Sequence, residues 1–179
     1  EEAHKIPLFL DEIYTTVTKP SRVEFGHRTV KAVKKWLKRM YRSQLQEKMH
    51  HAMLETSMRL MYGDALFENE MEIREMHKLT SIEQVLLLTA PRRFGKSYSV
   101  AMFVCACTMS MQGNETSIFS TGKRASSSLG RIIREFLIGE FKLDPKMIEK
   151  NTEENLFIRF GPNDVRKINT YPGSKHTYV

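Results

Sequence analysis

Residues 85–97 read VLLLTAPRRFGKS. The first four form a continuous apolar run, which is too short for an independent helix and typical of a strand buried on both faces of a parallel sheet. Turn-forming residues follow, and the pattern is helical from Lys96 to about Gln112, with Gly113 as a stop signal at the C-terminal end. The stretch therefore predicts a strand, a loop and a helix in succession.

The chain after this helix continues the same alternation. Residues 116–120 predict a second strand and residues 124–138 a second helix. The Asp-Pro pair at 144–145 begins a short helix, because a capping Asp followed by Pro is a helix start signal. Residues 155–160 and 165–171 predict two further strands, which a hairpin could join. Such alternation is typical of a doubly wound α/β domain with a parallel sheet.

The first eighty residues have a different, helical pattern. Helices are expected over residues 6–17, 28–62 and 64–79. The second of them is long and amphipathic, because its apolar residues recur at intervals of three and four, and a loop around Gly26 separates it from the first. The sequence thus predicts an all-helical region over residues 1–79 and an α/β domain over residues 80–179.

The helix predicted over residues 28–62 carries the net charge of the chain. It holds nine basic and two acidic side chains, a balance of +7 that equals the charge of the whole sequence. Its basic face could lie along a nucleic-acid backbone, an acidic partner or an anionic membrane surface, or it could be a solvated face that aids solubility. The acidic side chains between residues 64 and 75 would neutralise part of this face if the two helices packed antiparallel.

Composition excludes several classes of protein. Apolar residues make up 41%, charged residues 27%, and there are nine Gly and six Pro, which argues against collagen, low-complexity and disordered chains. No apolar run approaches the roughly 20 residues of a membrane span, and the first residues are acidic where a signal peptide would be basic. Cys105 and Cys107 lie two apart in an apolar run, which favours buried packing over a disulfide or zinc site. We therefore expect a soluble, intracellular protein without a membrane segment.

Residues 90–97, APRRFGKS, have the chemistry of a phosphate-binding loop. Such a loop needs backbone N–H groups around the β-phosphate, a Lys that reaches the β/γ oxygens, a hydroxyl that ligates Mg²⁺ and a helix N-terminus that faces the anion. Gly95, Lys96 and Ser97 supply the last part in the right order, between the predicted strand and helix. The loop departs from the common form in that an Ala stands where a Gly is usual and Pro-Arg-Arg replaces small residues.

The paired arginines ahead of Phe-Gly-Lys-Ser resemble the deviant phosphate-binding loop of large terminase subunits, the genome-packaging ATPases of tailed phages and herpesviruses. The likeness is closest to the herpesvirus type and covers about residues 84–140. It includes the stretch YSVAMF at 98–103 and continues weakly through IFSTGKR at 118–124. The resemblance implies a P-loop NTPase domain of the RecA-like (ASCE) type, with a parallel sheet flanked by helices.

The resemblance also implies a site for ATP and Mg²⁺. Lys96 would contact the β/γ-phosphates, Ser97 would ligate Mg²⁺, and Arg92 would sense or stabilise the γ-phosphate, with Lys96 and Arg92 as the catalytic residues. Thr121 and Lys123 could touch DNA or nucleotide at the carboxyl end of the second strand, where such folds bind ligands. The nucleotide-binding loop as a whole would comprise Ala90, Pro91, Arg92, Arg93, Phe94, Gly95, Lys96, Ser97 and Tyr98.

The resemblance further implies a biological setting. A homo-oligomeric ring would move double-stranded DNA, with viral portal and small packaging subunits as further partners, in the nucleus or cytoplasm of an infected host cell. The apolar strand ending in Asp-Glu that these ATPases require has no counterpart after residue 97, so we expect the chain to be a fragment that ends before it, ahead of a nuclease domain. A similar pattern at residues 8–12 precedes the loop, and we assign it to an ordinary amphipathic helix.

Two other classes of function stay open on the sequence. The RecA-like domain of a DNA helicase, or a transposon-associated DNA-dependent ATPase, would share the loop and the order of strands. A non-catalytic nucleic-acid-binding module would use the basic helix alone, and its nucleotide loop would be vestigial. Measured nucleotide affinity separates the last class from the two ATPases.

Overall fold

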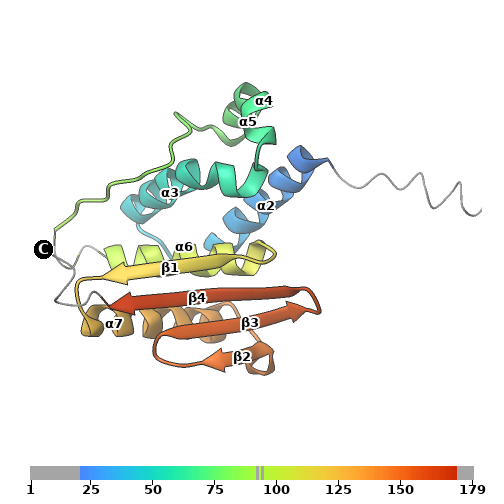
Figure 1. Cartoon of the computed structure of the whole chain (residues 1–179). Helices are drawn as coiled ribbons and strands as arrows, with labels where there is room; N and C mark the ends of the chain where they lie inside the picture. The colour runs from blue at the N-terminus through green and yellow to red at the C-terminus, as the bar shows by residue number, and fades with distance from the viewer. Residues whose placement is uncertain (1–20, 92, 94, 173–179) are drawn as a thin grey trace, which may run out of the picture.

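The computed structural model describes residues 21–91, 93 and 95–172 (Figure 1). The helix predicted over residues 6–17 lies outside the described residues, and so does the Asp-Glu pattern within it. The described chain is a mixed α/β structure, with helices first and a four-stranded sheet in its second half. Among these helices, none combines the length and the apolar character needed to cross a membrane.

The basic stretch over residues 28–62 forms two helices, so the prediction of a single long helix is wrong. Helix α2 covers Arg22–Leu37 and helix α3 covers Gln44–Tyr62. Each begins with a capping box, in which a Ser hydroxyl accepts from the backbone N–H three residues on and the Glu or Gln side chain there accepts from the N–H of the Ser. The capping box at Ser43 therefore starts a new helix inside an apolar periodicity that contains no Gly or Pro.

Gly26 lies inside α2, so the loop predicted around it is wrong. The end of α3 packs against this position, and a Cβ atom on Gly26 would lie 2.2 Å from Cδ1 of Tyr62. No other residue leaves room for that ring. Gly26 is thus in a helix because it allows close packing between two helices, and the local preference of Gly for turns is overridden.

The helix predicted over residues 64–79 is present in two pieces. Helix α4 covers Ala65–Glu68 and helix α5 covers Glu70–His77. Each contributes an apolar side chain to the core, Leu66 and Ile73, which are both almost fully buried. The prediction is confirmed except for the break between the two helices.

Residues 85–88 do not form the buried strand that the sequence predicted. They lie in a segment without helix or strand structure that leads from α5 to helix α6, which covers Lys96–Ser110 (Figure 1). Val85 and Leu87 are 83% and 84% exposed, whereas Leu86 and Leu88 pack against the core. The run keeps the two-residue alternation of a strand, but within the described chain no strand pairs with it, and pairing is what makes a strand.

The elements after α6 follow the predicted alternation. The helix ends at Ser110, shortly before Gly113, which has the positive φ of 63° expected of a stop signal. Strand β1 covers Glu115–Ser120 and helix α7 covers Lys123–Glu135, which continues as a π-helical turn over Phe136–Glu140. The predicted strand and helix are therefore confirmed, with boundaries shifted by one to a few residues.

The sheet is mixed, with the strand order β1-β4-β3-β2. A 3₁₀ turn over Pro145–Met147 leads to β2, Ile148–Asn151, then β3, Asn155–Gly161, and β4, Asp164–Pro172. The predicted hairpin is confirmed as β3 and β4, and β2 was not predicted. In the described chain only β1 and β4 pair in parallel, and the connection between them is long, because it includes α7, β2 and β3. The tight connections between β2, β3 and β4 allow antiparallel pairs only. The prediction of a parallel sheet is wrong for these strands.

The core of the molecule is centred on α6. Helix α7 packs against β1 and β4, and α6 contacts α7 as well as α2 and α3. The buried apolar side chains of all these elements form one continuous cluster. The opposite face of the sheet presents Phe119 and Tyr171, exposed side chains whose rings stack at 5.0 Å.

Candidate functional site

The loop predicted to bind phosphate leads directly into α6. Gly95 is the N-cap of this helix and has a left-handed conformation, with φ of +78°, and Arg93 also has a positive φ of +66°. A Cβ atom on Gly95 would lie 3.2 Å from Nε2 of Gln46 in α3. The left-handed backbone conformation therefore favours Gly at this position, and a Cβ atom would also have to displace the end of the Gln46 side chain slightly.

The first turn of α6 is suited to an anion. No side chain caps it and it contains no acidic residue, while Ser97 and Tyr98 are exposed. The first N–H groups of a helix have no partner within the helix, and the helix dipole adds partial positive charge at the same end. This end of α6 can therefore bind phosphate oxygens.

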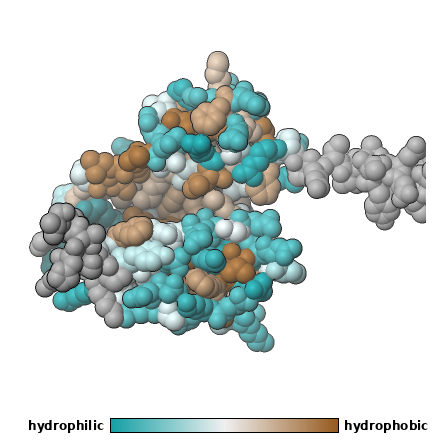
Figure 2. All heavy atoms as spheres, viewed as in Figure 1, coloured by the Kyte–Doolittle hydropathy of each residue, from teal (hydrophilic) through white to brown (hydrophobic). Residues whose placement is uncertain are grey.

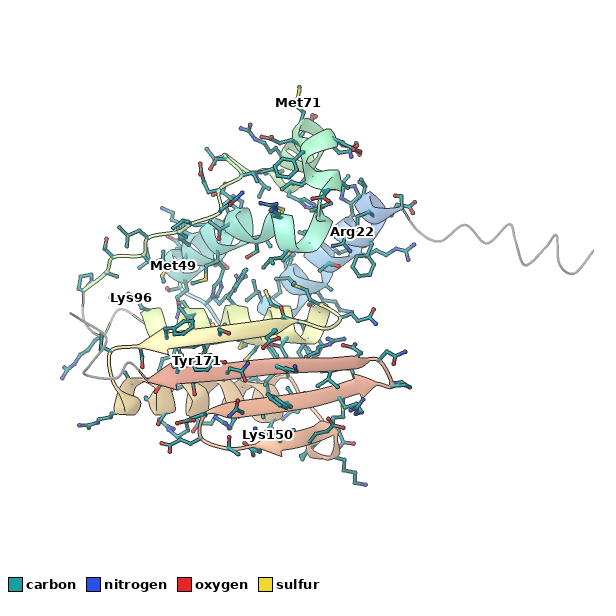
Figure 3. All side chains as sticks on the ribbon, viewed as in Figure 1. Arg22, Met49, Met71, Lys96, Lys150 and Tyr171 are labelled. Carbon is teal, nitrogen blue, oxygen red and sulfur yellow. The ribbon has the colours of Figure 1, made fainter. Side chains whose placement is uncertain are left out.

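A second helix start lies at the same edge of the sheet. After α6 the chain reverses, so the carboxyl end of β1 returns to the first turn of α6, and α7 begins there with the uncapped Gly122. Strand β4 is parallel to β1 and ends at this edge, where Figure 3 shows Lys96 and Tyr171. Thr121 is exposed between β1 and α7, and Lys123 is the first residue of α7. The structure thus brings these two predicted residues to the end of the sheet where α6 begins.

Lys96 spans the loop. Its Nζ donates a hydrogen bond of 2.9 Å to the carbonyl oxygen of Ala90, six residues earlier, and the side chain is half-buried. The contact holds the ammonium group near the start of the loop. Because an ammonium group has three N–H donors, Lys96 can keep this bond or exchange it for bonds to phosphate oxygens.

The rest of the predicted set is described in part. Arg92 and Phe94 lie outside the described residues, so the role of Arg92 at the γ-phosphate stays a prediction. The described residues contain no group of three or more His, Cys, Asp or Glu side chains that could hold a metal ion. The donors near the loop therefore fit a phosphate chain well, and they fit Mg²⁺ only through the Ser97 hydroxyl together with phosphate oxygens and water.

Helix α3 supports the first turns of α6 through His50. The ring Nε2 lies 2.8 Å from the carbonyl oxygen of Ser99, and the Ser99 hydroxyl donates to the carbonyl oxygen of Gly95 at 3.0 Å. His50 is 2% exposed, and burial lowers its pKa. The sequence carried no signal for this contact, because it joins residues 49 positions apart through packing of two helices.

An apolar cavity of about 340 Å³ lies beside the start of the loop. Its lining residues come from α3 and from the segment before the loop: Leu45, Lys48, Met49, Ala52, Leu87, Leu88, Thr89, Ala90 and Pro91. Figure 2 shows hydrophobic side chains gathered on this side of the molecule, where the segment runs along α3. A mostly apolar cavity of this size next to phosphate-binding groups could take a planar nucleobase. The sequence did not predict it, because it forms between distant segments.

The two cysteines have the packing role that the sequence predicted. Cys105 and Cys107 are both buried in α6, and the Sγ of Cys105 contacts the carbonyl oxygen of Ile133 in α7 at 3.5 Å. Burial raises the pKa of both thiols, to about 12 for Cys107. Neither thiol therefore ionises near neutral pH, and neither is suited to nucleophilic chemistry.

Comparison with known proteins assigns no family to the chain. No protein-family model matches the sequence, and no curated protein matches it significantly. The terminase likeness of residues 84–140 therefore stays a prediction, and the case for a function rests on the loop geometry described above.

Proposed function

We propose that this chain binds ATP·Mg²⁺ at residues 90–98 and forms part of an ATP-driven DNA translocase of the large terminase type. The observation that carries the proposal is the left-handed Gly95 followed by Lys96 and Ser97 at the uncapped start of a 15-residue helix. The start of α7 at the same edge is a second helix N-terminus without a side-chain cap. In this proposal β1, α6, α7 and β4 are part of a P-loop NTPase fold of the RecA-like type.

Within this site, the residues of the loop have separate tasks. Lys96 and the N–H groups of the first turn would bind the β- and γ-phosphate oxygens, and Ser97 would hold the metal ion. Mg²⁺, when bound, neutralises charge that develops on the phosphoryl oxygens. Arg92 would stabilise the same charge from the loop. The Asp-Glu pair that activates water in such enzymes has no counterpart after residue 97, so hydrolysis would need acidic groups from another segment.

The proposed partner is double-stranded DNA. Helix α2 and its C-cap residue supply the positive charge that would bind DNA phosphates. In the described part of the chain, no ion pair with a carboxylate is formed by Lys31, Lys34, Lys35 or Lys38. When Lys side chains contact backbone phosphates, counterions are released from the DNA. This contribution to binding does not depend on the DNA sequence. The homo-oligomeric ring, the viral portal and small packaging subunits, and the location in an infected host cell are proposals that follow from the terminase resemblance.

The direct test is the affinity for ATP·Mg²⁺ of the wild-type chain and of Lys96→Ala, measured by titration calorimetry. We expect Lys96→Ala to weaken binding about 10- to 100-fold, because a hydrogen bond to a charged group contributes roughly 1.5–3 kcal/mol. Lys146→Ala is the matched control, since Lys146 is an exposed lysine in the 3₁₀ turn before β2, and it should bind like wild type. Equal binding by wild type and Lys96→Ala would contradict the proposal.

A second candidate is a nucleic-acid-binding module without nucleotide chemistry. It is favoured by the lysines of α2 that lack carboxylate partners, which do not depend on the loop. If neither the wild-type chain nor Lys96→Ala binds ATP·Mg²⁺ but both bind duplex DNA with a strong salt dependence, this second function replaces the first. A DNA helicase or a transposon-associated ATPase would give the same nucleotide result as a terminase.

A further inference from the structure

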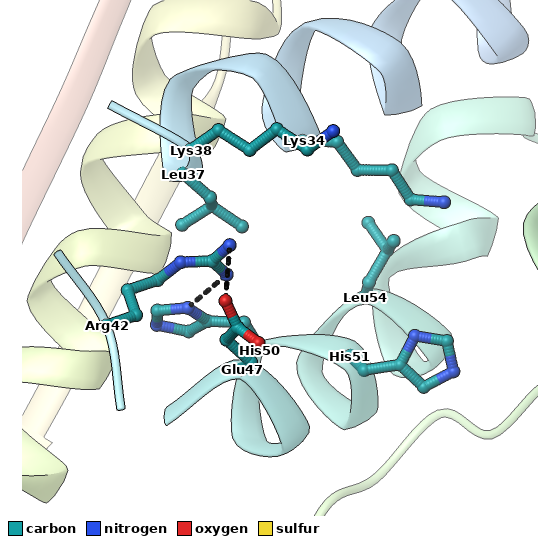
Figure 4. A pocket seen from close by; sticks show the side chains of 8 residues that line it. All are labelled: Lys34, Leu37, Lys38, Arg42, Glu47, His50, His51 and Leu54. Carbon is teal, nitrogen blue, oxygen red and sulfur yellow. Dashed lines mark hydrogen bonds and ion pairs between the residues drawn. The ribbon is translucent and has the colours of Figure 1, made fainter. Parts of the chain in front are cut away.

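A second cavity, of about 300 Å³, lies at the turn between α2 and α3. Its lining comes from the last turns of α2, from the turn itself and from the first half of α3: Lys34, Leu37, Lys38, Arg42, Glu47, His50, His51 and Leu54 (Figure 4). In Figure 4 the side chains of Lys34 and Lys38 lie along one side, with Arg42 and His50 opposite. The cavity does not share a lining residue with the segment 90–98, and the side chains of Lys34, Lys38 and Arg42 give it three cationic donor groups beside the apolar Leu37 and Leu54.

The charge of this cavity is not balanced. Two ammonium groups and one guanidinium group face it, against a single carboxylate, Glu47, which lies 3.6 Å from Nη2 of Arg42. In the described part of the chain, neither Lys34 nor Lys38 forms an ion pair. Burial and the positive charges of Lys38 and Lys78 lower the pKa of Lys34. A bound anion would remove this repulsion, so the folded chain gains electrostatic free energy from anion binding.

The floor of the cavity holds Arg42 in a fixed position. Nη1 of Arg42 lies 3.2 Å from Nδ1 of His50, and Arg has donors only, so Nδ1 is the acceptor and the proton of the neutral ring is on Nε2. That Nε2–H donates to the carbonyl oxygen of Ser99 at 2.8 Å. The Arg42 side chain, whose side-chain exposure is 13%, is thus oriented by a buried histidine, which is itself anchored on α6. A guanidinium group oriented in this way is suited to two parallel hydrogen bonds to an oxyanion.

We propose that the cavity between α2 and α3 is a binding site for a phosphate group, held by Lys34, Lys38 and Arg42. Three cations less the charge of Glu47 leave about two positive charges, which matches a phosphate dianion better than a carboxylate. The volume admits a phosphate together with several waters, since a water occupies about 30 Å³ in the liquid. The phosphate could belong to a nucleic-acid backbone or be a free anion.

A further lysine-lined cavity adjoins the proposed phosphate site along α2, and it could help to hold a longer nucleic-acid backbone. A further cavity of about 510 Å³ shares Lys34 and Lys38 and adds His27, Lys31, Lys35, Met76 and His77 to its lining. The positive surface therefore continues along α2 beyond the phosphate site. It also offers a matched control, because Lys31 and Lys35 belong to the same helix and line the cavity of about 510 Å³ but not the proposed phosphate site.

The experiment measures binding of inorganic phosphate in the absence of nucleotide, by calorimetry and by the shift in melting temperature, against sodium chloride at equal ionic strength. All variants carry Lys96→Ala, which weakens phosphate binding at the loop, and any binding that its backbone N–H groups retain is the same in every variant. A difference between the variants therefore does not depend on whether the loop is a nucleotide site. The double variant Lys34→Gln/Lys38→Gln is compared with Lys31→Gln/Lys35→Gln, which removes the same charge from the same helix. Gln is a good helix former, so both should melt like their parent without phosphate.

We expect phosphate to bind the parent in the millimolar range or tighter, with at least a tenfold loss in Lys34→Gln/Lys38→Gln and less than a threefold change in Lys31→Gln/Lys35→Gln. No phosphate binding by the parent, or an equal loss in the two double variants, would overturn the proposal. Equal losses of phosphate affinity would mean that the net charge of α2 attracts anions without a specific binding site.

A second titration, with a short DNA duplex, identifies the source of the phosphate. If a backbone phosphate occupies the cavity, the duplex displaces inorganic phosphate, and its affinity falls further in Lys34→Gln/Lys38→Gln than in the control. If a free anion occupies it, the two double variants bind the duplex equally while only the first loses inorganic phosphate. Either result supports the site, and loss of duplex binding without loss of inorganic phosphate contradicts it.

Discussion

The start of α6 and the turn between α2 and α3 are the two proposed anion sites, and they are built from different parts. At α6 the donors are backbone N–H groups and Lys96, all within one short stretch of sequence, and the geometry depends on the left-handed Gly95. At the α2–α3 turn the donors are long side chains of Lys34, Lys38 and Arg42, positioned by His50 of a second helix. A site made of backbone groups can therefore be proposed from a sequence motif, whereas a site made of side chains from two helices can be found only in the folded structure.

The largest expected effect is the dependence of stability on pH that the buried His77 causes beside α2. The ring Nε2 of His77 lies 2.5 Å from the hydroxyl of Tyr62, and burial, followed by the charges of Lys34 and His27, lowers the pKa of His77 to about 4. A neutral His is favoured in the folded state, so its contribution to stability is present above pH 6.5 and is lost as the pH falls toward 4, by up to about 3 kcal/mol.

Chemical denaturation at pH 7, 5.5 and 4 checks this expectation. His77→Gln should lose less stability than wild type over this range, because it cannot bind the proton. Adding Lys34→Gln to the wild type should also reduce the loss, since it removes one of the charges that oppose protonation of His77. An identical pH dependence in wild type and His77→Gln would show that another group causes the acid sensitivity.

A smaller effect is expected from His50, which contacts both anion sites. His50→Leu removes the hydrogen bonds of the ring to Arg42 and to the carbonyl oxygen of Ser99, and leaves Arg42 with its ion pair to Glu47, so the free energy of unfolding should fall by about 2 kcal/mol. The neighbouring His51 is the matched control, because it is partly exposed and pairs with Glu55 at 3.6 Å within the same helix. His51→Leu should change stability by less than about 0.5 kcal/mol. Similar losses in the two variants would show that the link between α3 and α6 contributes little.

Several elements could be predicted from the sequence because their signals are local. The stop at Gly113, the alternating strand before α7 and the two strands of the hairpin each depend on neighbouring residues, and the structure has them. The failures depend on tertiary structure. Residues 85–88 lack a partner strand within the described chain, and Gly26 is helical because Tyr62 packs on it. The sequence of β2, IEKN, is mostly charged and polar and so does not indicate a strand, which is present because it pairs with β3.

The two proposed sites also differ in how far the sequence could predict them. Gly95, Lys96 and Ser97 could be proposed as a phosphate loop from the sequence, because their chemistry is contiguous. The cavity at the α2–α3 turn was not predicted, since the apolar periodicity of residues 28–62 indicated one long helix. The capping box at Ser43 is the local signal that marks the start of a second helix there. The floor of the cavity also requires the contact of His50 with Ser99, which no local pattern encodes.

A substitution at Gly95 tests whether the two proposed sites bind their ligands independently, and its expected effect on stability is moderate. Gly95→Ala should lower the free energy of unfolding by about 1 kcal/mol, because a side chain at φ of +78° is strained, and it should weaken ATP·Mg²⁺ binding as well. Phosphate binding at the cavity should not change. Gly139→Ala serves as the control, since Gly139 has no positive φ and a Cβ there would meet nothing within 4 Å. If Gly95→Ala weakens phosphate binding at the cavity as much as nucleotide binding, the two sites are not independent.

The smallest expected effect is a gain. Glu47 is the only carboxylate that lines the cavity, and its side chain is largely exposed. Glu47→Gln removes a negative charge that competes for Arg42, so inorganic phosphate should bind about two- to fivefold more tightly, which corresponds to less than about 1 kcal/mol for an exposed pair. Glu55→Gln, one turn or more away on the same helix, should have little effect. Weaker phosphate binding in Glu47→Gln would mean that Glu47 orients Arg42 instead of competing for it.

The most direct measurement of the central claim is a structure of the chain with Mg²⁺ and an ATP analogue that cannot be hydrolysed. We expect phosphate oxygens within hydrogen-bond distance of Lys96 Nζ and of the first backbone N–H groups of α6, with the Ser97 hydroxyl on the metal ion. The analogue bound elsewhere, with Lys96 still directed only at the carbonyl oxygen of Ala90, would contradict the account.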